Sequence, residues 1–151
     1  ALRANMQGRP NISVLEGEKG LRQVYNEMEA ANSICFWSNL ELFEKQFQDI
    51  FDKLSGAIGA QQIRTREIIS NTPEARKSAK RYALTAGRNY SARIATVEGI
   101  HNDNAIYGNV VAIFRLHESN LFVIRIEDAT IAQTMKAIFE MAWKSAENFI
   151  N

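Results

Sequence analysis

The sequence predicts a single α/β domain in which a mixed β-sheet lies between two layers of helices, a three-layer sandwich. Strand-like and helix-like segments alternate over residues 11–87, as they do in folds with parallel strands. The dipeptide Gly108-Asn109 is typical of a tight turn between antiparallel strands. The run VVAIF (110–114) is apolar throughout, which indicates a strand covered on both faces. The strand–helix units imply parallel strands and the tight turn implies antiparallel neighbours, so the sheet should be mixed.

Two strand–helix units are expected at the N-terminus. The segment NISVLEG puts Ile12 and Val14 on one face of a strand. The helix after it carries an apolar stripe of Leu21, Val24, Tyr25, Met28 and Ala31. SICFW (33–37) is the second strand, and Ser38 with Glu41 forms a capping box that opens a long helix. The apolar face of that helix comprises Leu40, Phe43, Phe47, Ile50, Phe51, Leu54 and Ile58.

A third unit and a group of strands follow. IRTREIIS (63–70) is the third strand, and Thr72 as N-cap with Pro73 at the first helical position opens a helix that ends near Gly87. The next strands are NYSARIAT (89–96), AIY (105–107), VVAIF (110–114) and LFVIRI (121–126).

The last predicted element is a helix opened by Thr130 and Gln133 as a second capping box. Its broad apolar face comprises Ile131, Met135, Ile138, Phe139, Ala142, Trp143 and Phe149. The complete expected order is β-α-β-α-β-α-β-β-β-β-α.

Composition limits the class of protein. A chain of 151 residues with 46% apolar content is long enough for one well-buried core. The single Cys35 cannot form an internal disulfide, which favours a reducing compartment. The sequence has no apolar run long enough for a membrane span and no signal peptide, so we predict a cytoplasmic protein without membrane contact.

Motifs for catalysis or metal binding are not found. His101 and His117 lie 16 residues apart in polar loops, without further ligands at metal-binding spacing. The segment HNDN (101–104) fits either a weak oxygen-ligated cation site or ordinary turn chemistry, and the turn is the commoner use of such residues. The sequence lacks glycine-rich phosphate loops and nucleophile motifs. It therefore predicts no enzyme activity, no metal and no cofactor.

Charge is unevenly distributed along the chain. Residues 64–93 carry a net charge of +6 and residues 16–53 a net charge of −4. The basic segment could line an anion site, meet an acidic face of a second subunit or be solvated. Exposure to water is the simplest expectation for four side chains of the predicted helix, namely Arg76, Lys77, Lys80 and Arg81. Arg64, Arg66 and Arg93 are better ligand candidates because they lie on predicted strands, where a charged side chain needs a partner or solvent.

Three segments resemble the effector region of TrmB-like transcriptional regulators. They are RPNISVLEGEKGLRQVYNEM (9–28), IYGNVVAIF (106–114) and IAQTMKAIFEMAWKSA (131–146). The resemblance extends over residues 9–149, although residues 46–99 match only in the order of elements. It implies a fold similar to half of a phospholipase D, preceded in the family by a winged helix-turn-helix and a dimerising linker helix.

The resemblance also implies domain boundaries within this chain and a set of binding partners. Residues 1–9 would be the end of the linker helix and a linker, and residues 10–151 a single effector-sensing domain. DNA would be contacted only through the absent N-terminal domain. The expected partners are a second copy in a homodimer and a small-molecule effector, either a sugar or an anionic metabolite.

Active phospholipase D-like proteins use a His-x-Lys-x4-Asp motif, from which this sequence departs at both histidines. Asp103 stands two residues after His101, and Ser119 two residues after His117. We therefore predict a non-catalytic effector domain. The alternative is a phospholipase D-like phosphodiesterase or a nucleotide-processing enzyme whose degenerate site is completed by a partner.

The ligand pocket of an open α/β sheet usually lies outside the carboxyl ends of its strands. Our candidate lining residues for this pocket are Trp37, Arg64, Arg66, Arg93 and Tyr107. They offer aromatic stacking and anion pairing. For Trp37 and Tyr107 the alternative is ordinary packing of aromatic side chains on strands.

Overall fold

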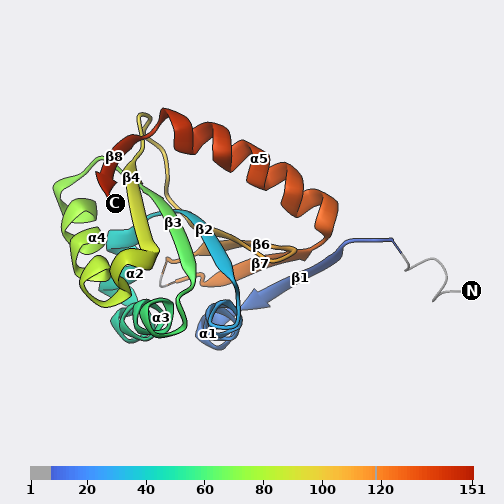
Figure 1. Cartoon of the computed structure of the whole chain (residues 1–151). Coiled ribbons are helices and arrows are strands. Elements are labelled where there is room, and N and C mark those ends of the chain that lie inside the picture. The colour runs from blue at the N-terminus through green and yellow to red at the C-terminus, as the bar shows by residue number, and fades with distance from the viewer. Residues whose placement is uncertain (1–7, 118) are drawn as a thin grey trace, which may run out of the picture.

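A mixed β-sheet with helices on both faces forms the centre of the domain, as the sequence predicted (Figure 1). The computed structural model describes residues 8–117 and 119–151. The predicted end of a linker helix, within residues 1–9, falls mostly on residues 1–7 and so lies outside the described residues.

Within the described residues the sheet has eight strands in the order β1-β7-β6-β5-β2-β3-β4-β8. They are β1 (Asn11–Glu16), β2 (Ser33–Ser38), β3 (Arg64–Ile69), β4 (Tyr90–Ile94), β5 (Asp103–Tyr107), β6 (Val110–Arg115), β7 (Phe122–Glu127) and β8 (Glu147–Ile150). Strands β2, β3 and β4 are parallel, and the other neighbouring pairs are antiparallel. The turn at Gly108-Asn109 joins β5 to β6, so the predicted hairpin and the mixed sheet are confirmed.

The helices form two unequal layers. They are α1 (Gly17–Met28), α2 (Leu40–Gln46), α3 (Gln48–Gln61), α4 (Pro73–Ala86) and α5 (Ala129–Ser145), with a short 3-10 turn η1 (Gly87–Asn89). Figure 1 shows α1 to α4 on one side of the sheet and α5 on the other. A large apolar cluster around Tyr25, Phe51 and Tyr90 fills the first interface, and a smaller one around Ile68 and Phe139 fills the second. None of the helices in the described ranges has both the length and the apolar character needed to cross a bilayer.

The single long helix expected after Ser38 is in fact two helices, because the chain bends at Phe47. This residue leaves the helical region with φ −132° and ψ 52°. Phe43, before the bend, stacks on Tyr25 with 4.8 Å between ring centroids. Phe51, after the bend, meets Tyr82 edge-on at 4.8 Å. The bend lets one apolar stripe reach two different aromatic partners, which sequence periodicity alone does not indicate.

Two of the three predicted N-caps are displaced. Asn39 caps α2, because Ser38 is still the last residue of β2. Asp128 caps α5 in place of Thr130, with its side chain accepting the backbone N–H three residues later at 2.8 Å. Thr72 caps α4 as predicted. In each case a side-chain oxygen satisfies a backbone N–H that has no partner inside the helix.

The final strand, β8, was not predicted, and the prediction that Phe149 lies on the last helix is wrong. Helix α5 ends at Ser145, and Ala146 is extended with φ −76° and ψ 150°. The chain then pairs antiparallel with β4. This pairing satisfies backbone groups along the edge of β4, which a longer helix would leave open.

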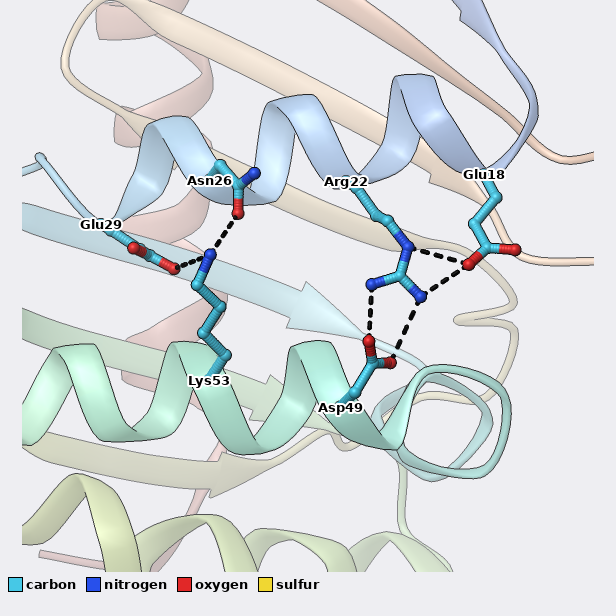
Figure 2. A network of polar contacts seen from close by, with 6 residues as sticks. All are labelled: Glu18, Arg22, Asn26, Glu29, Asp49 and Lys53. Carbon is cyan, nitrogen blue, oxygen red and sulfur yellow. Dashed lines mark hydrogen bonds and ion pairs between the residues drawn. The ribbon is translucent and has the colours of Figure 1, made fainter.

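Ion pairs on the outer surface join acids and cations of the same N-terminal segment, so the net negative charge of residues 16–53 remains. Figure 2 shows Arg22 of α1 between Glu18 of the same helix and Asp49 of α3, with 2.6 Å from Arg22 Nη1 to Asp49 Oδ2. Lys53 of α3 lies 3.4 Å from Glu29. Exposed pairs of this kind contribute little to stability. Their effect here is to match the acids of the N-terminal segment with its own cations.

Helices α3 and α4 approach each other closely at Gly59. A Cβ atom on Gly59 would lie 2.6 Å from the backbone carbonyl oxygen of Thr85. Gly56, three residues earlier on α3, has more room, since its Cβ would lie 4.0 Å from Thr85 Cγ2. Only Gly59 is therefore required by the packing of these two helices.

We predict opposite effects for alanine at these two glycines. Gly59→Ala should destabilise the fold by about 1–3 kcal/mol, because a methyl group would push the α4 backbone away. Gly56→Ala should stabilise it by up to about 1 kcal/mol, because alanine favours the helix. Urea unfolding of the two variants measures both effects. Equal changes of the same sign would contradict the proposed packing.

Candidate ligand-binding site

The carboxyl ends of β2, β3 and β4 meet at one edge of the sheet, where a cavity of about 390 Å³ lies. We call it the edge cavity. Its polar side chains are those of Asn39, Glu41, Ser70, Asn71, Thr72, Thr96, Glu98 and His101. They come from the loops after the three parallel strands, from the first turn of α2 and from the segment that enters β5. The volume falls in the range of small-molecule pockets.

Local structure fixes several of these side chains. Asn39 and Thr72 are the N-caps of α2 and α4. Thr72 Oγ1 also lies 3.4 Å from Glu41 Oε1, so the beginnings of the two helices contact each other across the cavity wall. Asn71 Oδ1 accepts a hydrogen bond from Arg76 Nη2 at 2.7 Å. The wall is thus held by bonds that involve its own lining residues.

Glu41 offers an unused acceptor. Its Oε2 atom is buried and has no hydrogen-bond partner among the described residues. A buried carboxylate oxygen without a partner carries a desolvation cost, which a donor from a ligand would remove. Hydroxyl groups are suitable donors for such an oxygen.

A buried carboxyl, Glu67, lies behind the edge cavity at the centre of the parallel strands. It accepts hydrogen bonds from Ser38 Oγ of β2 and Tyr90 OH of β4, each at 2.5 Å. Burial raises the pKa of Glu67 to about 7, although both hydrogen bonds lower it, and the nearby charge of Glu41 raises it further. Glu67 therefore links the cavity wall electrostatically to the core.

A second buried carboxyl, Asp103, stands two residues after His101, where a His-x-Lys motif would require a lysine. It accepts a hydrogen bond from Tyr25 OH inside the α1 to α4 layer. Burial raises the pKa of Asp103 to about 8, and the charge of Glu67 adds to this rise. Asp103 is thus part of the core, whereas His101, two residues earlier, is exposed and lines the edge cavity.

Three of the five predicted ligand residues share the face of the sheet beneath α5. Trp37 is half-buried and tilts against Phe139 of α5. Arg66 forms an ion pair with Glu140. Arg93 donates to the Trp143 carbonyl oxygen at 2.7 Å, and its guanidinium lies 4.4 Å from the centre of the Trp143 ring.

The other two predicted residues lie elsewhere. Arg64 is exposed at the amino end of β3, away from the edge cavity. Tyr107 is on the opposite face from Trp37 and donates to Glu27 Oε2 of α1 at 2.8 Å. The five side chains therefore do not converge on one cavity, and a role for them in ligand binding stays a prediction.

Sequence reasoning missed most residues of the edge cavity. Asn39 and Ser70 directly follow the observed strands β2 and β3, and Asn71 directly follows the predicted strand 63–70, so a position at the end of a parallel strand was a usable signal. His101 was considered as a metal or cation ligand and as a member of a catalytic motif, but not as a lining residue of a small-molecule pocket. No group of three or more His, Cys, Asp or Glu side chains in the described ranges could hold a metal ion. The expected lack of a metal and a cofactor remains a prediction.

Comparison with solved structures identifies the fold as phospholipase D-like. Nuc from Salmonella typhimurium, a phospholipase D family member, matches with a TM-score of 0.70 and 14% identity over 95% of this chain and 100% of its own. NucT from Helicobacter pylori matches with a TM-score of 0.73 and 10% identity over 93% and 100%. The predicted fold class is thereby confirmed.

A third similar structure is TrmBL2, an archaeal chromatin protein. Its TM-score is 0.63 at 16% identity, over 91% of this chain and 53% of TrmBL2. No protein-family model and no curated protein matches the sequence. At such identities the likeness shows a shared fold.

The prediction that this chain is not an enzyme is overturned by these neighbours. The fold is that of a phospholipase D family member matched over its full length. The departure from the His-x-Lys motif at His101 is therefore insufficient to exclude catalysis.

The buried carboxyls predict a specific pH dependence of stability. Because the folded pKa of Glu67 is about 7 and its ordinary value is 4.5, folded protein holds a proton in this window that unfolded protein releases. Stability should therefore fall as pH rises from 4.5 to 7, by up to about 1 kcal/mol per pH unit. Glu67→Gln should make this fall less steep in urea unfolding at pH 5, 6, 7 and 8, and the slope that remains is the contribution of Asp103, whose pKa is also raised.

Glu74→Gln, at an exposed position in the first turn of α4, is the matched control and should keep the wild-type slope. Parallel curves for wild type and Glu67→Gln would show that Glu67 is ionised in the folded state throughout the window.

Proposed function

We propose that this domain binds a neutral, polyhydroxylated small molecule in the edge cavity and serves as the effector-sensing domain of a DNA-binding transcriptional regulator. The observation that carries the proposal is the chemistry of the cavity lining. Its side chains supply hydroxyl, amide, carboxyl and imidazole groups, and no Lys or Arg of the described chain is among them. Such a surface suits a sugar-like ligand.

The charge of the cavity lining discriminates between a sugar and an anionic metabolite, the two effector classes that the sequence left open. A phosphate group in the edge cavity would approach the carboxyl groups of Glu41 and Glu98, with no Lys or Arg side chain in the lining to offset them; Arg76, outside the lining, is hydrogen-bonded to Asn71. A hydroxyl group can instead donate to the Glu41 carboxyl once this side chain turns its buried Oε2 atom toward the cavity, and the amides of Asn39 and Asn71 can both donate and accept. We therefore favour a sugar over an anionic metabolite.

The regulatory part of the proposal rests on the sequence resemblance to TrmB-like regulators and on the fold likeness to TrmBL2. In this account DNA is contacted by a separate domain, and the protein acts as a cytoplasmic homodimer. A ligand in the edge cavity contacts the beginnings of α2 and α4 together with the 95–101 segment. It would shift the regulator between two states by binding one of them more tightly.

A second candidate is phosphodiester hydrolysis with His101 as the nucleophile. It is favoured by one observation, the location of His101 in the wall of the edge cavity. The assay is turnover of bis(p-nitrophenyl) phosphate. Turnover that is lost in His101→Ala and kept in His117→Ala, at the exposed histidine outside the cavity, would establish this candidate. Absence of turnover in the wild type would remove it.

The ligand proposal predicts binding of neutral saccharides. In a panel of neutral and phosphorylated mono- and disaccharides, at least one neutral member should raise the melting temperature of the protein. At a ligand concentration a hundred times Kd, binding should raise the free energy of unfolding by about 2.7 kcal/mol. Glu41→Gln should weaken that binding about tenfold in calorimetry, because the charge-assisted hydrogen bond is lost.

Glu16→Gln, at an exposed position outside the edge cavity, is the matched control and should bind as wild type does. Stabilisation by the phosphorylated members alone would contradict the proposal.

A further inference from the structure

A second cavity, of about 160 Å³, lies on the α5 side of the sheet. We call it the α5 cavity. Trp37 and Ile68 of the sheet form its floor, and Met135 and Phe139 of α5 cover it. Most of its lining is apolar, unlike that of the edge cavity. It therefore suits a hydrocarbon group and not a sugar ring.

The two cavities share one wall. Ala95, Thr96, Val97 and Ile100, all in the segment between β4 and β5, line both of them. A molecule that lies across the exposed side of this segment would contact the polar lining on one side and the apolar lining on the other. Val97 is 70% exposed, so the apolar side of the segment is accessible from solvent.

Size limits what the α5 cavity can hold. An engineered apolar cavity of about 150 Å³ binds benzene, so a cavity of about 160 Å³ accepts a ring or a chain of roughly six carbons. The neighbouring guanidinium groups do not change this preference. Arg66 is paired with Glu140, and Arg93 is bound to the Trp143 carbonyl oxygen and lies over the Trp143 ring.

We infer that the ligand is an amphiphile, with a neutral polyhydroxylated head in the edge cavity and an apolar group of about six carbons in the α5 cavity. An alkyl or aryl glycoside has this chemistry. The inference rests on the proposed function and extends it, since it adds a second binding region and a class of substituent.

Three probes separate the two parts of the inference: methyl β-D-glucopyranoside, hexyl β-D-glucopyranoside and hexan-1-ol. The hexyl glucoside should bind at least about tenfold more tightly than the methyl glucoside, because its chain leaves water. Hexan-1-ol alone should bind weakly and change the tryptophan emission, since Trp37 lines the α5 cavity and Trp143 stacks on its lining residue Phe139. Calorimetry and tryptophan fluorescence measure these effects.

Variants on α5 provide the specificity test. Ala142 is exposed at the border of the α5 cavity, so Ala142→Phe can obstruct the cavity without burying a larger side chain in the core. Ala137→Phe, exposed on the same helix but outside the cavity, is the matched control. The advantage of the hexyl over the methyl glucoside should disappear in the first variant and persist in the second.

Each failure has a distinct meaning. Equal affinity of the two glucosides, or a hexyl advantage that survives Ala142→Phe, would overturn the inference and leave the polar site standing. Binding of hexan-1-ol when no neutral saccharide binds would support the α5 cavity but remove the proposed function. If sedimentation shows that Ala142→Phe, but not Ala137→Phe, dissociates a dimer, the surface is a subunit interface and the inference is wrong.

Discussion

Glu67 connects the three parallel strands on which the rest of the domain depends. From the middle of β3 its carboxyl accepts hydrogen bonds from Ser38 of β2 and Tyr90 of β4. These bonds form when Ser38 of β2 lies beside Ile69 of β3 and Ile69 lies beside Ile94 of β4. This register aligns the carboxyl ends of the three strands. A buried carboxyl of this kind is costly unless it is hydrogen-bonded. The arrangement thus favours one register, and the edge cavity is a consequence of that register.

Successive side chains along these strands point to opposite faces of the sheet. The carboxyl ends of the strands therefore lie between two different helix layers. Thr65 and Glu67 point into the layer of α1 to α4, whereas Arg66 and Ile68 point toward α5. The first layer buries the larger apolar cluster against its strands, while α5 leaves a small apolar cavity beside the 95–100 segment. A polar and an apolar cavity therefore meet at the same loop, which is the physical basis for the proposed amphiphilic ligand.

Much of the fold was predictable from sequence because local patterns decide it. The apolar run 110–114 and the turn before it specify a hairpin and a doubly covered strand, and both are present. The bend at Phe47 and strand β8 were not predictable, since they depend on aromatic partners and on the open edge of β4. Likewise Arg66 looked available for a ligand until α5 placed Glu140 beside it. The site residues required the strand order, which periodicity does not supply.

The central claim is that a neutral polyhydroxylated ligand binds at the carboxyl ends of β2, β3 and β4. Amide chemical-shift mapping in ¹H–¹⁵N spectra, with the saccharide that stabilises the protein most, tests it directly. The account predicts that the largest shifts occur at residues 39–41, 70–72 and 95–101, which surround the edge cavity. Shifts concentrated around Tyr107 and Glu27, at the opposite end of the sheet, would contradict it.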